Sequence, residues 1–276
     1  MSAGPPVGLI AGNGRFPFLA AAGARRAGRR VVAVAIREEA DPALEGAVDE
    51  LHWVGLGQLG RCIDVLKAGG AREAVMAGQV KHRQIFSGIV PDLKLMVVLA
   101  RLAIRNTDSL IGAVADALAE AGITLLPSTA LLVEHLARAG AMTGRQPSRE
   151  ARKDIEYGRE VAQALAKLDL GQTVAVKECA AVALEAMEGT DEVIRRAGRL
   201  AGPGVTVVKV AKPRQDPRFD VPVVGRGTLA AMADAGARVL AVDAVRTLLI
   251  DKAEFLAEAD GQQIAVWGME AREPAP

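Results

Sequence analysis

The side chains best suited to chemistry lie in one segment, residues 209–222, which follows an apolar run. Asp216 and Asp220 offer carboxylate oxygens, which Mg²⁺ binds together with water and substrate phosphates. Lys212, Arg214 and Arg218 can neutralise phosphate charge, arginine through paired hydrogen bonds and lysine as a point charge. Three prolines stiffen the segment. The combination predicts phosphoryl chemistry at a divalent metal. The competing interpretation is a solvated loop with internal ion pairs.

A second polar cluster runs from Glu185 to Glu192. Thr190 is a typical helix N-cap, and Asp191 and Glu192 are favourable in the first turn of the helix that would follow. Capping does not account for Glu185, which comes directly after an apolar segment. An acid at a strand end and a helix N-terminus can both face residues 209–222. Glu185, Thr190 and Asp191 are therefore candidate binding residues.

Glycine-rich turns follow predicted strands in the first half of the chain. Gly12 and Gly14 begin the motif Gly-Asn-Gly-Arg-Phe-Pro, which stands between a strand and a helix. Backbone N–H groups at such a turn can bind a phosphate. The motif ends in Pro17 where a dinucleotide fingerprint has glycine, so the match to a nicotinamide site is weak. Two more turns lie at 55–60 and 77–83, the latter with Gly78. Loop geometry alone can require these glycines; together they predict a rim for a ligand.

The elements that would position these groups differ between the two halves of the chain. In the first half, apolar strand-like segments alternate with helical ones, at 7–11, 16–27, 31–36, 51–54, 59–68, 74–76, 92–104, 108–121 and 123–126. This order is typical of a parallel sheet covered by helices. The second half sets two strands side by side, at 173–177 and 180–184, which indicates a mixed sheet. We expect an α/β protein with a Rossmann-like parallel-sheet domain (1–138), a linker (139–148) and a second α/β domain with a mixed sheet (149–276).

Composition excludes several classes of function. The chain has 34 Lys and Arg against 33 Asp and Glu, and 3% aromatic residues, so no surface for nucleic acid is expected. It shows no signal-peptide pattern and no apolar run of the roughly 18 residues that span a membrane. Two cysteines suit a reducing compartment, so the expected location is cytoplasmic. Neither a nucleophile elbow nor a P-loop motif is present.

The order of these motifs resembles the LpxI-type UDP-2,3-diacylglucosamine pyrophosphatases of lipid A biosynthesis, over nearly the whole chain. The similarity rests on residues 8–17, 76–80, 108, 122–123, 174–177, 185, 188–191, 212–222 and 225. The stretch Lys-Pro-Arg-Gln-Asp-Pro-Arg-Phe-Asp-Val-Pro at 212–222 is the most specific of these motifs. Small departures occur at 106–108 and 178–180.

The resemblance implies a homodimeric, Mg²⁺-dependent enzyme that hydrolyses UDP-2,3-diacylglucosamine to UMP and 2,3-diacylglucosamine 1-phosphate (lipid X). The lipid would lie between the two domains, and the enzyme could contact the inner membrane peripherally. Asp220 would be the leading metal ligand and would position or deprotonate the attacking water, with Asp216 assisting the metal. Lys212 and Arg218 would neutralise the pyrophosphate. The implied substrate-binding residues are Gly12, Gly14, Gly78, Glu185, Thr190, Asp191, Arg214 and Gln215.

Two other classes of function stay open. One is a non-catalytic module that binds a nucleotide sugar or phospholipid through residues 209–222. The other is an NAD(P)-dependent oxidoreductase built on the turn at 12–17. Metal-dependent release of UMP separates the pyrophosphatase from both. The apolar residues Met76, Ile85, Phe86 and Ile89 are candidates for acyl-chain contact, core packing or a dimer interface.

Overall fold

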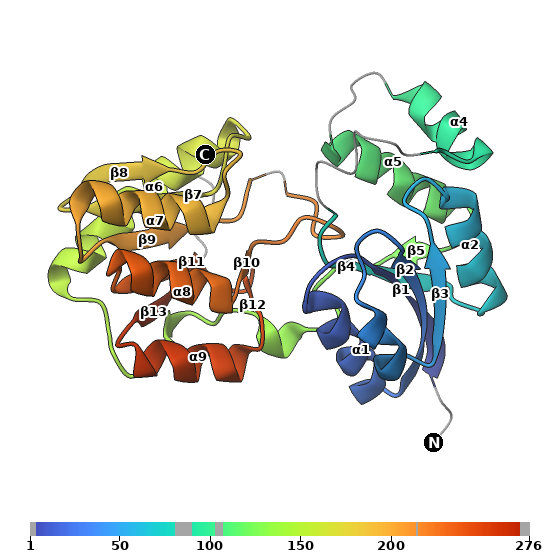
Figure 1. Ribbon diagram of the computed structural model, residues 1–276, viewed down its shortest axis with the longest axis horizontal. Coiled ribbons are helices and arrows are strands. Elements are labelled where there is room, and N and C mark those ends of the chain that lie inside the picture. Colours follow the sequence, from blue (N-terminus) through green and yellow to red (C-terminus); the bar gives the residue numbers. More distant parts are fainter. Residues whose placement is uncertain (1–3, 81–89, 103–106, 214, 271–276) are drawn as a thin grey trace. The chain divides into compact units, whose positions relative to one another are not determined.

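The computed structural model describes residues 4–80, 90–102, 107–213 and 215–270 (Figure 1). The chain folds into two compact units. The N-terminal unit comprises residues 1–133 together with 217–219, and the C-terminal unit comprises residues 134–216 and 220–276. The predicted functional segment therefore belongs to both units, because residues 217–219 pack with the first and the residues around them with the second.

The N-terminal unit is built on a five-stranded, wholly parallel sheet with the strand order β3-β2-β1-β4-β5. This result confirms the predicted Rossmann-like sheet. Its strands are β1 (Gly4–Ala11), β2 (Arg29–Ile36), β3 (Glu50–Val54), β4 (Glu73–Ala77) and β5 (Thr124–Leu125). Its helices are α1 (Phe16–Arg26), η1 (Pro42–Ala47), α2 (Leu59–Ala68), α4 (Leu93–Arg101) and α5 (Thr107–Glu120).

Apolar side chains cover both faces of this sheet, as expected when helices pack on both sides. On one face, Val31 and Ala33 of β2 join a core cluster with α1 and η1. On the other face, Val34 joins a cluster with α2, α4 and α5. Neighbouring residues of one strand point to opposite faces, so the continuous apolar run of β2 serves both clusters.

The C-terminal unit contains a six-stranded mixed sheet in the order β6-β13-β11-β9-β7-β8, which confirms the second half of the fold prediction. β9, β11 and β13 run parallel, whereas β6, β7 and β8 are antiparallel to their neighbours. These strands are β6 (Gly140–Ala141), β7 (Thr173–Lys177), β8 (Ala180–Leu184), β9 (Thr206–Lys209), β11 (Val239–Asp243) and β13 (Ala265–Met269). The predicted linker contains β6; the linker and domain limits stay predictions.

Helix α6 (Arg149–Lys167) packs on one face of the mixed sheet, and α7 (Thr190–Ala201), α8 (Arg226–Ala235) and α9 (Lys252–Gly261) supply the core on the other. The short η2 (Val133–His135) precedes the sheet in sequence. β12 (Leu248–Leu249) does not join this sheet and pairs with β10 (Val223–Val224) in a separate two-stranded ladder.

Candidate active site

One edge of the mixed sheet gathers the charged groups of the C-terminal unit. Thr173 begins β7 and lies opposite Lys209, the last residue of β9, while Glu185 directly follows β8. These ends meet because β7 runs antiparallel to both of its neighbours. Ligands of α/β sheets characteristically bind beyond the carboxyl ends of parallel strands, where Lys209 lies. The edge is therefore the natural place for a functional site.

A chain of hydrogen bonds joins Lys209, Thr190 and Glu185. Lys209 is 5% exposed, and its Nζ donates to Thr190 Oγ1 over 2.7 Å. Thr190 Oγ1 in turn donates to Glu185 Oε1 over 2.9 Å. The expectation that Thr190 caps α7 was wrong. The cap position is Gly189, with φ of 83°, and the Thr190 hydroxyl is used by its two charged neighbours instead.

Glu185 is buried, yet its surroundings favour the ionised carboxylate. Burial acts to raise its pKa, but the charge of Lys209 and hydrogen bonds from Gln172, Thr173 and Thr190 outweigh this effect. The pKa therefore lies below its ordinary value of 4.5. One of these bonds runs from the Gln172 backbone N–H to Glu185 Oε2 over 3.0 Å. The site keeps a fixed negative charge beside Thr190.

This lowered pKa predicts a pH-dependent part of the stability. Glu185 stabilises the fold fully above about pH 4.5, and this contribution is lost as the pH falls through its lowered pKa. The difference in unfolding free energy between the wild type and Glu185→Gln should therefore shrink as the pH falls below 4.5. Urea unfolding at a series of pH values measures it. A difference that stays constant across this range would contradict the assignment.

Lys209 is a candidate site residue to which the sequence interpretation gave no role. Burial lowers its pKa, while the carboxylates of Glu185, Asp191 and Asp220 act in the opposite direction; the net pKa lies below its ordinary value. Its ammonium group thus interacts with three acids that the sequence predicts to be site residues. The sequence signal was available, since a charged residue that ends an apolar strand needs a buried partner.

The predicted segment forms its own set of contacts in the C-terminal unit. Lys212 Nζ lies 2.7 Å from Asp169 Oδ1 and 3.7 Å from Asp220 Oδ2. The backbone N–H of Lys212 donates to Gln215 Oε1 over 3.0 Å. The Asp220 N–H donates to the carbonyl of Asp216 over 2.9 Å, so the two predicted metal ligands stand one turn apart. Lys212, Gln215, Asp216 and Asp220 are thereby brought together.

Two predicted residues of the segment have other outcomes. Arg218 belongs to the N-terminal unit, where its guanidinium lies 5.9 Å from the centre of the Phe219 ring. Arg214 lies outside the described residues, as do Ile85, Phe86 and Ile89. Asp191 is the second residue of α7, and its Oδ1 accepts a hydrogen bond from the Thr228 hydroxyl of α8 over 3.1 Å. Asp191 is therefore held between the starts of two helices.

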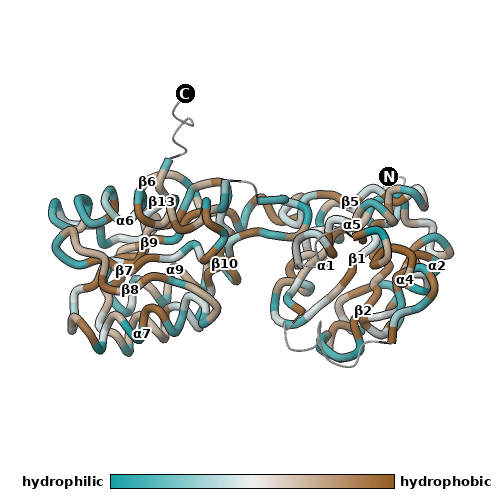
Figure 2. Tube along the Cα trace, turned by 90° about the horizontal axis from the view of Figure 1, so that it is seen from above, coloured by the Kyte–Doolittle hydropathy of each residue, from teal (hydrophilic) through white to brown (hydrophobic). Residues whose placement is uncertain are grey.

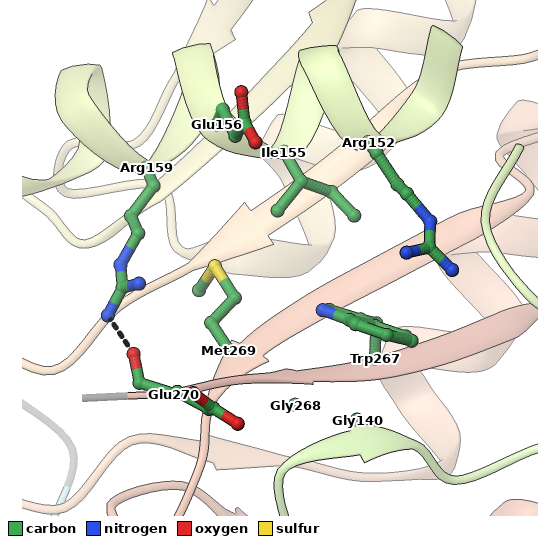
Figure 3. Close-up of a pocket in the computed structure, with 9 residues that line it drawn as sticks. All are labelled: Gly140, Arg152, Ile155, Glu156, Arg159, Trp267, Gly268, Met269 and Glu270. Carbon is green, nitrogen blue, oxygen red and sulfur yellow. Dashed lines mark hydrogen bonds between the residues drawn. The ribbon is translucent and has the colours of Figure 1, made fainter. Parts of the chain in front are cut away.

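A buried ion pair anchors the beginning of the segment. Asp243 Oδ2 accepts from the backbone N–H of Ala211 over 2.8 Å, and Asp243 Oδ1 lies 3.3 Å from Arg159 Nη2. Arg159 also donates to the carbonyl of Glu270 over 2.6 Å, the bond drawn in Figure 3. Because Ala211 directly precedes Lys212, this pair fixes where the functional segment leaves the sheet. No local sequence pattern indicates the pair, since the three residues are far apart in the chain.

Figure 3 shows a pocket that is lined by Arg159 of this pair. The volume of the pocket is about 360 Å³. Arg152 lies over the Trp267 ring, 4.8 Å from its centre, and Arg159 points toward Glu270. Glu156 also lines the pocket. Two guanidinium groups and two carboxylates leave the pocket without a charge preference for either an anion or a cation.

In the N-terminal unit, the predicted Gly12 and Gly78 allow two loops to touch. Asn13 and Gln79 form a bridge, with hydrogen bonds of 2.8 and 3.1 Å between their backbones. A Cβ atom at Gly12 would lie 2.6 Å from the Gln79 carbonyl oxygen, and one at Gly78 would lie 2.6 Å from that of Asn13. Gly78 has φ of 93° and Gly14 has φ of 94°. The bridge uses the backbone N–H of Asn13, which donates to the Gln79 carbonyl. A phosphate bound at this turn would need the same N–H group.

Gly12→Ala should therefore destabilise the protein by about 1–3 kcal/mol, because backbone must move to make room for the new Cβ. Gly46→Ala is a matched control. A Cβ there meets nothing within 4 Å, and its effect should stay within about 0.5 kcal/mol. Urea unfolding compares the two variants. Equal stabilities would show that the close approach of the loops is dispensable.

A cavity of about 480 Å³ lies within the N-terminal unit, in the size range of ligand pockets. Gly12 and Gly78 contribute to its lining, which is otherwise mostly apolar and includes Ile10, Phe16, Met76, Leu95, Leu110 and Phe219. Ser128 holds the segment that carries Phe219: its N–H donates to the Pro217 carbonyl over 2.8 Å. Its Oγ lies 2.7 Å from the carbonyl oxygens of both Met76 and Arg218, and its single proton serves one at a time.

The residues predicted to bind Mg²⁺ fit that ion by donor type. Asp216 and Asp220 supply hard carboxylate oxygens, of which Mg²⁺ usually takes one or two. Among the residues that the structure describes, no three His, Cys, Asp or Glu side chains are grouped to hold a metal. An ion at Asp216 and Asp220 would draw its other ligands from water and substrate.

Within the same described residues, no helix has the length and apolar character needed to cross a bilayer.

The fold and site define an α/β protein of two units, one with a parallel sheet and an apolar cavity, the other with a lysine–carboxylate centre at a sheet edge. The family models "LpxI N-terminal domain" and "LpxI C-terminal domain" match residues 6–135 and 138–267. A relative from Caulobacter vibrioides named UDP-2,3-diacylglucosamine pyrophosphatase LpxI is 31% identical, over 97% of this chain and 98% of its own length. The chain belongs to the LpxI family.

A likeness to a solved structure adds nothing to this assignment. The biotin carboxylase domain of a thermophilic 2-oxoglutarate carboxylase matches 62% of this chain with 15% identity and a TM-score of 0.28. The match spans 35% of that chain. At this level of similarity, neither fold nor function can be transferred.

Proposed function

We propose that the chain hydrolyses the pyrophosphate bond of UDP-2,3-diacylglucosamine, giving UMP and 2,3-diacylglucosamine 1-phosphate, in lipid A biosynthesis. The observation that carries the proposal is the full-length match to the LpxI relative, combined with the charged centre around Asp220. In this reaction, water adds to one phosphorus atom and the bond from that phosphorus to the bridging oxygen breaks. The bridging oxygen leaves with the other phosphate.

Residues of the 209–222 segment and of the sheet edge beside it can perform this reaction in distinct roles. Asp220 accepts the proton of the attacking water, and Lys212, 3.7 Å from its Oδ2, is proposed to neutralise charge on the phosphate oxygens. Thr190 and Gln215 are proposed to orient those oxygens, and Arg218 to neutralise charge on them. Lys209 holds Thr190 in place from the buried side. Glu185 and Asp191 are proposed to contact the sugar or the metal.

Asp216 and Asp220 would hold Mg²⁺ in this proposal. A bound Mg²⁺ would neutralise charge on the pyrophosphate oxygens. Because carboxylates repel phosphate, the two acids need such a countercharge next to an anionic substrate. Asp169, 60% exposed, already pairs with Lys212 and leaves Lys212 only partly available for that task.

The apolar cavity of the N-terminal unit is proposed to receive acyl chains of the lipid. Phe219 lines this cavity and is covalently bonded to Asp220, the proposed catalytic residue. Gly12, Gly14 and Gly78 are proposed to lie along the substrate near its mouth. We further propose a homodimer in the cytoplasm that reaches its substrate at the inner face of the inner membrane.

Release of UMP from UDP-2,3-diacylglucosamine by the purified chain tests the proposal. With Mg²⁺ present, UMP and the lipid phosphate should appear in equal amounts, and EDTA should stop their formation. Substrate binding without UMP under any divalent ion would favour the binding module. A rise in melting temperature with NAD(P), without UMP release, would favour the oxidoreductase. Mass spectrometry of lipid carried through purification gives an independent reading of the substrate class.

A further inference from the structure

The outer face of α4 exposes an unusual row of large apolar side chains. Val90, just before the helix, is 84% exposed; Leu93 is 73%, Met96 is 48% and Val97 is 41% exposed. Their spacing by three or four residues places them on one side of the helix. Figure 2 shows hydrophobic residues along α4. Isolated exposed apolar residues are normal, but a contiguous group marks an interaction site.

The inner face of the same helix is part of the apolar interior. Leu95 and Val98 are buried, and Leu95 lines the 480 Å³ cavity. Helix α4 therefore separates the cavity from the exposed apolar side chains on its outer face. A molecule with long apolar chains can contact hydrophobic residues on the inner and on the outer face of this helix.

The charges on α4 suit an anionic partner. The helix contains Lys94 and Arg101 and no acidic residue. Both cations share a single carboxylate, since Glu120 lies 3.6 Å from Lys94 and 3.5 Å from Arg101. Asp92, at the start of the helix, turns its carboxylate inward to the backbone N–H groups of Leu95 and Gly60. Apolar side chains flanked by basic ones are the pattern of helices that lie in an anionic bilayer surface.

We propose that the outer face of α4, formed by Val90, Leu93, Met96 and Val97, docks the protein onto an anionic phospholipid bilayer. The inference rests on the proposed function, because a bilayer lipid is the substrate whose chains would enter the cavity behind α4. A second copy of this chain fits the face less well. Four side chains on one helix fall far short of the roughly 20–30 residues that each partner contributes to a stable interface.

Vesicle flotation of the full chain tests the docking face directly. The probe is a vesicle of equal parts phosphatidylethanolamine and phosphatidylglycerol, compared with pure phosphatidylcholine. The wild type should float with the anionic vesicles. The double variant Leu93→Asp, Val97→Asp should bind at least about tenfold more weakly, because two inserted side chains are lost. The control Met187→Asp, Leu200→Asp carries the same charge change at positions 87% and 67% exposed, and should bind like the wild type.

Enzyme assays separate this inference from the proposed function. The Leu93→Asp, Val97→Asp variant should lose about tenfold in UMP release from vesicle-borne substrate, and lose little with substrate dispersed in detergent. If the wild type floats as expected but releases no UMP from vesicle-borne or detergent-dispersed substrate, the proposed function is rejected and the docking face is not. A wild type that does not float, or a variant that floats like it, would overturn the docking face. The docking face would also be overturned if sedimentation showed that the variant no longer forms a dimer while its vesicle binding stayed unchanged. If the variant does not fold, Leu93→Gln, Met96→Gln provides the same comparison.

Discussion

Asp220→Ala should reduce turnover of UDP-2,3-diacylglucosamine by at least about 10³-fold, because the variant loses a charge interaction worth several kcal/mol in the transition state. Asp220 interacts with two cations: its Oδ2 lies 3.7 Å from Lys212 Nζ, and its charge acts on Lys209. Unfolding free energy should change by less than about 1 kcal/mol, since the lost ion pair is partly exposed. UMP release under single-turnover conditions measures the chemical step.

Asp169→Ala is the matched control for this loss. Asp169 is closer to Lys212 than Asp220 is, at 2.7 Å, yet it is more exposed and is not a proposed metal ligand. Its removal should change turnover less than about fivefold, the effect of losing a surface ion pair. If both variants lose activity equally, the charge of Lys212 rather than Asp220 governs the reaction. Near-wild-type turnover of Asp220→Ala would remove it from the active site.

Lys209→Met should be the most destabilising substitution at the sheet edge, by about 3 kcal/mol or more. The methionine keeps the length of the side chain but leaves Glu185, which is 8% exposed, without its buried countercharge. The Thr190 hydroxyl also loses the ammonium donor 2.7 Å away. Urea unfolding reports the stability, and turnover should fall as well because Lys209 interacts with Asp191 and Asp220.

Two further variants isolate the charge effect at Lys209. Lys177→Met removes a lysine from the same sheet whose Nζ contacts only the carbonyl groups of Ala201 and Pro203 in the described part of the chain, and should cost about 1 kcal/mol. The double variant Lys209→Met, Glu185→Gln removes both charges and should be more stable than Lys209→Met alone by about 1 kcal/mol or more. Strictly additive effects of the two substitutions would show that the two charges do not interact.

Local patterns in the sequence were sufficient to place most elements of the fold. The predicted helix at 59–68 and strands at 173–177 and 180–184 coincide with α2, β7 and β8. These patterns work because side-chain periodicity and capping depend on residues a few positions apart. The pairing of Leu248 and Leu249 with β10 lies beyond such patterns, because it joins residues that are distant in the chain.

The candidate site shows the same division. Lys212, Asp216 and Asp220 could be selected from the sequence because their chemical types lie close together in the chain. Asp243 and Arg159 could not, because each is explained by a partner on another element. The position of Lys209 at the end of an apolar strand indicated a buried partner but not which one. For Lys209 the partner is Glu185, reached through Thr190; for Asp243 it is the start of the functional segment. Thr190 illustrates the limit most clearly, since its hydroxyl bonds to Glu185 rather than capping its own helix.

The sequence by itself therefore determined the α/β class, the order of the elements and the phosphate- and metal-compatible chemistry of residues 212–220. The tertiary structure alone decided that a buried lysine joins this chemistry, that residues 217–219 pack with the N-terminal unit, and that α4 presents apolar side chains outward. The physical reason is the distance along the chain over which each interaction acts. Backbone preference and side-chain periodicity act over a few residues, whereas burial and charge pairing depend on which distant segments the sheets bring together.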